Sequence, residues 1–467
     1  MAFVRETEAL ASVAGRLGWD QETVMPRGAA GQRGEETAAI ERVLHSRRSD
    51  PRVGAWLDAA GAPEDAVTAA QLREIRRGFD RATRVPGDLA TALARVTSVA
   101  QGEWAAARAA DDFAAFAPRL AEVVALKREE AAALADGGDL YDALLQDYEP
   151  GATAAGLEAM FGALRPRLVA LRDKVMNAQQ PTALNGHFDE ARQVRLAAEL
   201  ARAFGYDFNR GRIDKAVHPF SSGSGADVRI TTRTDTADPF NCFYSTIHEV
   251  GHATYEQQVD PAFALTPIGR GASMAVHESQ SRLFENQLGR ERAFCGWLHA
   301  RMEDEFGAGT AGDRETFYAT VNRVHPGFIR TESDEVQYNL HVLMRFDLER
   351  ALISGSLAVP DLEEAWNARF LKDFGVAVPK ASLGALQDVH WSVGLFGYFP
   401  TYTLGNVYAG CLFKSLQADV ATLDADLARG DTVAVTGWLT ARLRQFGALR
   451  YGADTIRHAT GVEPDEA

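Results

Sequence analysis

Residues 111–131 read DDFAAFAPRLAEVVALKREEA, and their apolar side chains recur every three or four positions. The recurring positions are Phe113, Phe116, Leu120 and Val123, followed by Lys127. This spacing is typical of one face of an α-helix, with Lys127 expected to be exposed or to extend its charged end into solvent. Residues 188–205, FDEARQVRLAAELARAFG, repeat the pattern and end in Gly205, a frequent helix terminator. Because such Ala-rich segments dominate the chain, the sequence predicts an all-α, mainly helical protein.

The helical pattern lapses between about Tyr206 and Phe240. Two segments there, DKAVHPF (214–220) and ADVRITTR (226–233), show the alternation that is typical of β-strands. Between them lies SSGSG (221–225), whose composition favours a turn. We therefore expect a small β-sheet here, beside the helix that the next segment, residues 241–257, is expected to form.

No repeat, low-complexity tract or long linker divides the 467 residues. The clearest break is QQPTALNG (179–186), which is expected to be a loop. It would separate an N-terminal helical layer, about 1–180, from a second part, about 187–467, which contains the segment HEVGH (248–252) analysed below. We expect both parts to form one domain, 1–467.

The composition excludes several classes of function. The formal net charge is −15, which argues against a nucleic-acid surface because phosphate binding needs clustered basic residues. No window approaches the roughly 18 apolar residues of a membrane span. The N-terminal segment lacks the features of a signal peptide, and the three cysteines form no CxxC pair. A cytoplasmic protein without membrane contact and with buried thiols is expected.

The segment NCFYSTIHEVGHATYEQ (241–257) indicates a metal site. His248 and His252 are four residues apart, so on a helix both imidazoles lie on one face and can reach one metal ion. Glu249 follows His248 and can reach a water activated by the metal rather than the metal itself, which suits a general base. A random chain of this composition would contain HExxH only about 0.02 times. The alternative is a surface helix with two unrelated histidines.

A third ligand is available in AVHESQSRLFENQ (275–287). Glu278 lies on another expected helix, and the intervening loop is long enough to bring the chain back. Two histidines and a glutamate leave one coordination position open, which is typical of catalytic zinc sites. Glu285 is the alternative ligand. His277 is expected to point elsewhere, either in a supporting role or as a buried histidine.

Separated segments along nearly the whole chain resemble the thermostable carboxypeptidases of the Taq type, a family of HExxH metallocarboxypeptidases. The similar segments are LGWDQETVMP (17–26), HPF (218–220), DVRIT (227–231), HEVGH (248–252), HESQ (277–280), IRTESD (329–334), GALQDVHW (384–391) and GYFPTYTLGN (397–406). One departure is Ser333, where the family usually has alanine before the final Asp; this exchange of small residues puts little in doubt.

The resemblance implies a helical fold with a deep groove, like that of neurolysin and angiotensin-converting enzyme. It also implies stepwise release of C-terminal residues from peptides with a free C-terminus, with broad specificity that excludes proline. Zinc is the expected metal, with cobalt or manganese as alternatives, and a homodimer is the expected assembly.

The resemblance and the chemistry of the side chains together suggest further site residues. Tyr402, then Tyr398 and His390, are candidate donors to the developing oxyanion. Arg330, or else Arg229, is the candidate for binding the terminal carboxylate, because guanidinium binds carboxylate through two hydrogen bonds. These arginines could instead brace structural carboxylates, Asp334 for Arg330 and Asp227 for Arg229. Further assignments concern Asp388, expected to orient His390, and His218 and Phe220, expected in the groove wall.

Two other functions remain open from the sequence. An endopeptidase or dipeptidase of the same helical class would use the same ligands. A non-catalytic helical protein with a structural metal site is the alternative from another class, and it would be expected to lack the base or a ligand.

Overall fold

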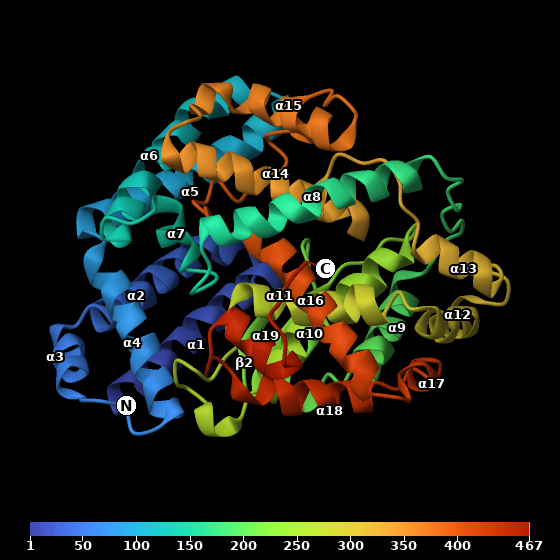
Figure 1. The fold of residues 1–467 in the computed structure, drawn as a ribbon, viewed down its shortest axis with the longest axis horizontal. Coiled ribbons are helices and arrows are strands. Elements are labelled where there is room, and N and C mark those ends of the chain that lie inside the picture. The colour runs from blue at the N-terminus through green and yellow to red at the C-terminus, as the bar shows by residue number, and fades with distance from the viewer. Residues whose placement is uncertain (467) are drawn as a thin grey trace. The chain divides into compact units, whose positions relative to one another are not determined.

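The chain is helical along most of its length in the computed structural model, which describes residues Met1–Glu466 (Figure 1). Those residues form nineteen α-helices, one π-helical segment, several 3₁₀ turns and three strands. The predicted mainly helical fold with a small sheet is confirmed. None of the helices within residues 1–466 has both the length and the apolar character needed to cross a membrane.

The chain divides into two compact units, each built from separate stretches of sequence. The first comprises Met1–Ala82, Pro181–Arg323 and Gly405–Pro464, and the second is mainly Thr83–Gln180 and Val324–Leu404. One boundary falls inside the loop expected at 179–186. Residues 1–82 nevertheless belong with the HEVGH helix, so residues 1–180 do not form a layer of their own. That all of it is one catalytic domain stays a prediction.

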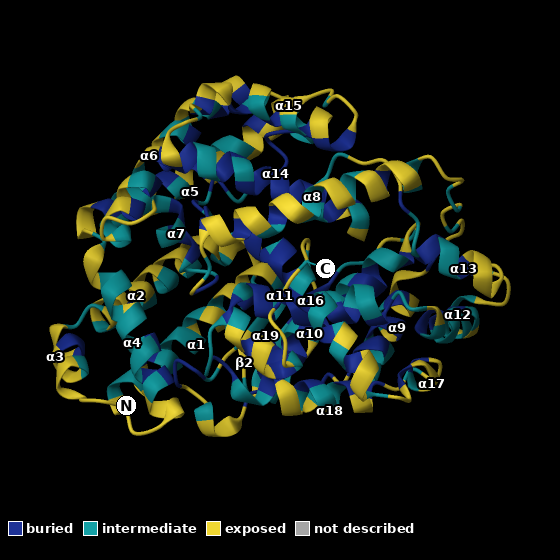
Figure 2. Ribbon diagram, in the orientation of Figure 1, coloured by how far each residue is buried: buried dark blue, intermediate teal, exposed yellow. Residues whose placement is uncertain are grey.

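The first unit is organised around α10, the helix that carries HEVGH. This helix is buried along most of its length and packs against α9, α11 and β3 (Figure 2). Near the N-terminus, α1 and α2 lie side by side (Figure 1). The helices of this unit are α1 (Ala2–Thr23), α2 (Ala30–Arg48), α3 (Pro51–Ala59), α4 (Ala66–Arg84), α9 (Glu190–Ala203), α10 (Pro239–Gln258), α11 (Met274–Arg282), α12 (Arg292–Phe306), α13 (Arg314–Val321), α16 (Pro400–Asp419), α17 (Leu423–Leu427), α18 (Val433–Arg442) and α19 (Gly452–Thr460), with α4 and α16 crossing a unit boundary.

Local signals explain the ends of these helices. Asp238 caps α10 by accepting a hydrogen bond from the Phe240 N–H, and Pro239 occupies the first helical position. Helix α9 ends before Gly205, whose φ of 84° is in the left-handed region, as the sequence predicted. Cys242 on α10 and Cys295 on α12 are buried thiols, as expected, and Cys411 is partly buried.

The sheet has the order β1-β3-β2, with β1 (Ile213–Lys215) parallel and β2 (Ser221–Ser224) antiparallel to β3 (Asp227–Thr232). The prediction of a turn at 221–225 is wrong, because four of these residues form β2. Gly223 explains the difference: a Cβ there would lie 2.0 Å from the Asp227 carbonyl oxygen, so only glycine allows this pairing. The sheet lies beside α10, since the Thr246 hydroxyl donates to that of Thr232 at 2.9 Å.

The second unit is built around α14, which is buried along much of its length and contacts α6, α7, α8 and α15 (Figure 2). Its helices are α5 (Gly87–Ala110), α6 (Phe113–Ala135), α7 (Leu140–Leu145), α8 (Ala154–Met176), α14 (Glu335–Ser354) and α15 (Leu362–Phe374). The apolar stripe predicted on α6 is buried. The expectation that Lys127 would be exposed, or would extend its charged end into solvent, is wrong: Lys127 is buried, and its charge is paired with Glu130 one turn later.

Glu349 of α14 lies at the centre of a buried cluster of polar groups in the second unit. Its carboxylate accepts hydrogen bonds from the Tyr141 hydroxyl (2.7 Å), the Trp391 indole N–H (2.8 Å) and the Gly397 N–H (3.1 Å). Burial raises the pKa of Glu349 to about 7, although these three donors act to lower it. Two of these donors, Trp391 and Gly397, lie at the two ends of a loop, and their hydrogen bonds to Glu349 fix that loop. His390 and Tyr398 flank it on either side.

Replacing Tyr141 with phenylalanine is expected to destabilise the protein more at pH 8.5 than at pH 5.5. The hydroxyl stabilises the ionised form of Glu349, so its loss costs about 1.5–3 kcal/mol only above the pKa near 7. The pKa of Glu349 is higher in the folded protein than in the unfolded chain, so the protein loses stability as pH rises. The variant raises the folded-state pKa further, so its stability declines more steeply with pH. Thermal midpoints at the two pH values check this.

Tyr206→Phe is the matched control for this experiment. The Tyr206 hydroxyl is also buried, but it donates to the Val228 carbonyl oxygen at 2.6 Å, which does not titrate. Its loss is expected to cost the same at both pH values. Equal costs at both pH values for Tyr141→Phe would contradict the assignment.

Candidate metal centre

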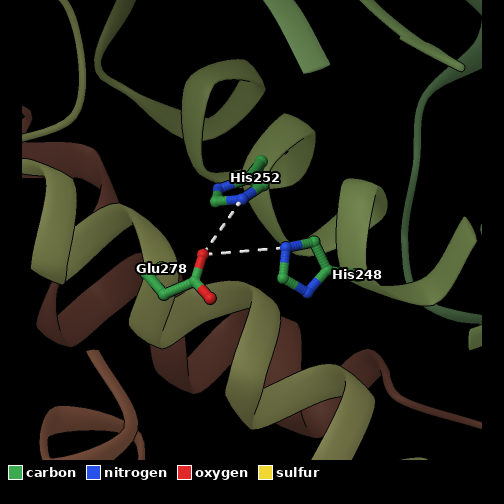
Figure 3. A group of neighbouring side chains, drawn as sticks. All are labelled: His248, His252 and Glu278. Carbon is green, nitrogen blue, oxygen red and sulfur yellow. Dashed lines mark ion pairs between the residues drawn. The ribbon is translucent and has the colours of Figure 1, made fainter. Parts of the chain in front are cut away.

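His248 and His252 lie one turn apart on α10, and Glu278 faces both from α11 (Figure 3). The Glu278 Oε2 atom is 3.6 Å from the His248 Nε2 atom and 3.5 Å from the His252 Nε2 atom. One ligand atom from each of the three residues lies within 4.8 Å of the others. Because ligands at about 2.1 Å from a tetrahedral ion are about 3.4 Å apart, this spacing suits one metal ion.

The ionisation states of two of these residues also suit a metal. Burial lowers the pKa of His252 to about 3, so its imidazole is neutral at pH 7. Burial acts to raise the pKa of Glu278, but Arg282 and His248 outweigh it and hold that pKa well below its usual range. Metal binding requires neutral imidazole and ionised carboxylate, which are the forms favoured at His252 and Glu278. The pKa of His248 is instead raised: burial acts to lower it, but the carboxylates of Glu278 and Glu285 outweigh burial.

Charged side chains behind the candidate ligands hold these ligands in place. The His248 Nδ1 atom is 2.8 Å from the Glu285 Oε2 atom, and Arg282 donates to Glu278 Oε1 (2.7 Å) and Glu285 Oε2 (3.2 Å). Glu285, the alternative ligand from the sequence, therefore contacts the far nitrogen of His248. It lies in the π-helical segment Leu283–Leu288 that continues α11. This contact orients the His248 ring.

Two glycines allow the helices around the site to approach closely. A Cβ on Gly251, within HEVGH, would lie 2.5 Å from the Ser281 Cα atom of α11. A Cβ on Gly405 of α16 would lie 2.6 Å from the Cγ and 2.7 Å from the Cβ atom of Glu278. Helix α11, and with it Glu278, is thus set between two helices at positions that exclude any side chain.

Glu249 is buried next to His248, with only 6% of the residue exposed. Its Oε2 atom has no hydrogen-bond partner among residues 1–466. Burial raises the pKa of Glu249 to about 7, despite the opposing effect of His248. A buried carboxyl group with one unpartnered oxygen and a pKa near neutrality is suited to proton transfer.

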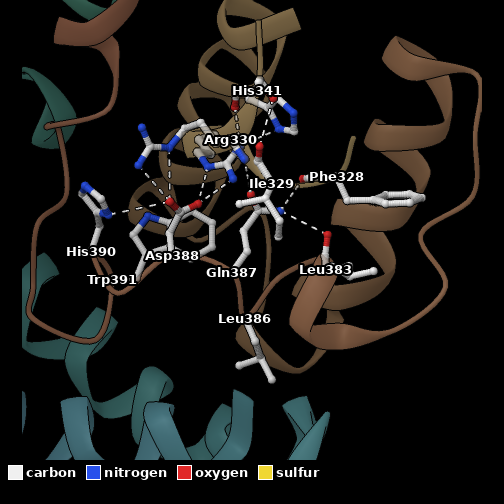
Figure 4. A network of polar contacts seen from close by, with 12 residues as sticks. Phe328, Ile329, Arg330, His341, Leu383, Leu386, Gln387, Asp388, His390 and Trp391 are labelled. Atoms are coloured by element: carbon white, nitrogen blue, oxygen red, sulfur yellow. Dashed lines mark hydrogen bonds and ion pairs between the residues drawn. The ribbon is translucent and has the colours of Figure 1, made fainter. Parts of the chain in front are cut away.

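Arg330 lies in the second unit, where it shares a carboxylate with another arginine (Figure 4). Its Nε and Nη2 atoms donate to Asp388 Oδ1 at 3.2 and 3.1 Å, and Arg345 Nε donates to Asp388 Oδ2 at 2.7 Å. Asp334 was expected as its alternative brace, but Asp334 caps α14 instead. The buried group of two arginines and one aspartate carries a net positive charge.

His390, Tyr398 and Tyr402 form an aromatic cluster in the second unit. The His390 Nε2 atom is 3.4 Å from the Tyr402 hydroxyl, and the Tyr398 and Tyr402 ring centres are 5.3 Å apart. Asp388 does not orient His390 as expected: their nearest atoms are 3.9 Å apart, because both carboxylate oxygens already bind arginines. Burial, then Arg330, lowers the pKa of His390 to about 3, so the ring is neutral.

Arg229 of β3 lies in the first unit and is braced as the sequence suggested. Its Nε and Nη2 atoms donate to the two carboxylate oxygens of Asp227 at 2.7 and 2.9 Å. Its guanidinium also lies 4.6 Å from the ring centre of Trp19. His218 is exposed and Phe220 is half-buried, both on the segment between β1 and β2.

The chain is similar to a known family of metallopeptidases over its whole length. The profile of the carboxypeptidase Taq (M32) metallopeptidases matches residues 1–467. The chain belongs to the carboxypeptidase Taq family.

Individual relatives agree with this assignment. Thermostable carboxypeptidase 1 of Thermus thermophilus is 41% identical across 99% of this chain and 94% of its own length. A protein of the same name from Pyrococcus furiosus is 32% identical across 100% of this chain and 95% of its own length. The crystal structure of an M32 carboxypeptidase from Deinococcus radiodurans R1 superposes with a TM-score of 0.96 and 38% identity, covering 99% of this chain and 95% of that one. As a family member the chain is a metallocarboxypeptidase, a hydrolase of peptides that uses a divalent metal.

Sequence reasoning missed two residues beside the candidate ligands in the first unit and one that pairs with Asp388 in the second. Arg282 follows Glu278 by four residues and Glu256 follows His252 by four, so helical spacing alone would have placed both beside the ligands. Arg345 gave no such signal, because its contact with Asp388 joins distant parts of the chain.

Proposed function

We propose that this chain removes C-terminal amino acids from peptides, with broad specificity that excludes proline, using Glu249 as general base. His248, His252 and Glu278 would hold the metal, for which zinc is the first choice and cobalt or manganese the alternatives. The observation that carries this proposal is the convergence of three ligand atoms within 4.8 Å, next in sequence to the buried Glu249. The Oε2 atom of Glu249 has no hydrogen-bond partner within residues 1–466.

The metal, when bound, would polarise the peptide carbonyl and lower the pKa of a water. Glu249 would take a proton from the attacking water and deliver it to the leaving amine. Its pKa of about 7 suits both steps, since the group can accept and release a proton near neutral pH. Tyr402, Tyr398 or His390 would donate a hydrogen bond to the developing oxyanion.

Recognition of the terminal carboxylate is assigned to Arg330, with Arg229 as the alternative. Two buried arginines share one aspartate in the Arg330 group, which leaves one positive charge that a carboxylate can neutralise. Arg229 is matched one-to-one with Asp227 by two hydrogen bonds. The excess charge favours Arg330.

A time course on paired peptides tests the proposal. The same peptide is supplied with a free or an amidated C-terminus, and products are followed by mass spectrometry. We expect a ladder that shortens only from the free C-terminus, and at least about 10²-fold slower cleavage of the amide, because the lost charge pair is worth several kcal/mol. Internal fragments, or equal rates on both peptides, would favour the endopeptidase alternative; no cleavage by the metal-loaded protein would favour a non-catalytic metal protein.

The family resemblance also leads us to propose a homodimer in the cytoplasm, with the two units acting as one catalytic domain. Light scattering of the purified protein checks the first of these. A mass of about twice 50.7 kDa is expected.

A further inference from the structure

A second histidine lies directly behind the candidate ligand His252. The Nδ1 atoms of His252 and His277 are 2.7 Å apart, within hydrogen-bond distance. The other ring nitrogen of His277, Nε2, is 2.8 Å from the Glu256 Oε1 atom. The Gly271 N–H also donates to that oxygen, at 2.9 Å. The side chains form a chain of contacts that leads from His252 to a buried carboxylate.

The distances determine where the protons lie. Only one of two Nδ1 atoms in such contact can carry a hydrogen. The His252 Nε2 atom faces Glu278 and is the ligand atom, so the single proton of a neutral His252 is on Nδ1. His252 therefore donates and His277 accepts. The proton of His277 is then on Nε2, where it is donated to Glu256.

We propose that His277 and Glu256 are positioning residues that hold His252 in its Nδ1–H tautomer and thereby set the affinity of the site for metal. The proposal rests on the proposed ligand role of His252. Neither residue touches the metal. Ligand histidines are commonly oriented through their second ring nitrogen, and losing that contact weakens metal binding.

The surroundings of His277 leave its ring little freedom to rotate. A Cβ on Gly271 would lie 2.6 Å from the His277 Cδ2 atom and 3.0 Å from the Tyr255 Cε1 atom. Both edges of the ring are also bound, one to His252 and the other to Glu256. The loop between α10 and α11 thus restrains the His277 ring, and this ring in turn orients His252.

The two candidate imidazole ligands are held differently. His248 contacts the Glu285 carboxylate directly, whereas His252 reaches Glu256 only through the ring of His277. A ring nitrogen is a weaker hydrogen-bond acceptor than a carboxylate. The main effect of His277 on His252 is therefore to set its orientation and tautomer. A substitution that keeps an acceptor should therefore preserve metal binding.

Two pairs of variants test this inference. Asparagine at 277 keeps an acceptor oxygen near the position of Nδ1, and leucine removes it; glutamine at 256 keeps an acceptor for the His277 N–H, and leucine removes it. Metal affinity is measured by competition between the apoprotein and a chromogenic chelator for zinc. The d–d spectrum of the cobalt-loaded protein reports the geometry of the ligands.

We expect His277→Leu and Glu256→Leu to bind zinc about 10- to 100-fold more weakly and to shift the cobalt spectrum. His277→Asn and Glu256→Gln should stay within about 3-fold of the parent protein, a ratio worth less than about 0.7 kcal/mol. His299→Asn is the control: this partly exposed histidine contacts the Gly312 carbonyl oxygen, far from the candidate ligands in the sequence, and its loss should change neither readout. Thermal midpoints verify folding.

Unchanged zinc affinity in His277→Leu, or equal losses in the leucine and acceptor-keeping variants at both positions, would overturn the inference. His252→Ala separates this from failure of the proposed function. If that variant loses zinc while His277→Leu does not, only the positioning role fails. If His252→Ala binds zinc as the parent does, the ligand assignment itself is wrong.

Discussion

Replacing Glu249 with glutamine is expected to lower kcat/KM by about 10²- to 10⁴-fold while leaving the metal content unchanged. Glutamine has nearly the same shape as glutamate, but its amide cannot take a proton from water. Glu249 is not one of the three residues whose ligand atoms converge, so metal binding should survive. Peptide hydrolysis and elemental analysis on the same sample check both expectations.

The same variant is expected to unfold at an equal or higher temperature. Burying the Glu249 carboxylate with an unpartnered oxygen costs free energy, and a neutral amide reduces that cost. Loss of activity together with retained stability is typical of residues kept for function. Glu305→Gln, which removes a carboxylate that pairs with Arg195, is the control and should keep full activity. Undiminished activity of Glu249→Gln would contradict the base role.

Replacing Gly405 with alanine is expected to weaken metal binding by about 10- to 100-fold or more. The new Cβ would lie 2.6 Å from the Glu278 Cγ atom, whereas carbon atoms pack at about 3.5–4.0 Å, so Glu278 must move by about 1 Å. Metal sites tolerate deviations of only about 0.2 Å in their ligand distances. Competition with a chelator measures the change.

Gly410 provides the matched control on the same helix. A Cβ there meets no atom within 4 Å, so Gly410→Ala gains only the helix propensity of alanine, about 1 kcal/mol. It should bind metal like the parent protein and unfold at a slightly higher temperature. If Gly405→Ala behaved in the same way, the close approach of α16 would not position Glu278.

The proximity of the candidate ligands could be predicted because it depends on local geometry. His248 and His252 share a helix face through their spacing alone, and Glu278 needed only a loop long enough to return. The motif resemblance then carried the family assignment across the chain, which the profile match confirmed. The helical fold followed from periodic apolar residues that were in fact buried.

The errors arose where tertiary contacts override local preference. Ser221–Ser224 forms a strand because β3 is available as a partner, although its composition favours a turn. Lys127 is buried because Glu130 neutralises it. Asp388 was assigned to His390, its neighbour in sequence, whereas two arginines from other parts of the chain occupy it. No spacing rule brings those arginines together.

The sharing of Asp388 by Arg330 and Arg345 has a consequence for mutational screens. Removing this carboxylate leaves two buried like charges without a counter-ion, at a cost of about 3–5 kcal/mol. Cells would then accumulate less protein, and a screen scored by peptidase output would rank position 388 with Glu249. Abundance measured alongside output would separate them: substitutions at 388 should deplete the protein, and those at 249 should leave it plentiful and inert.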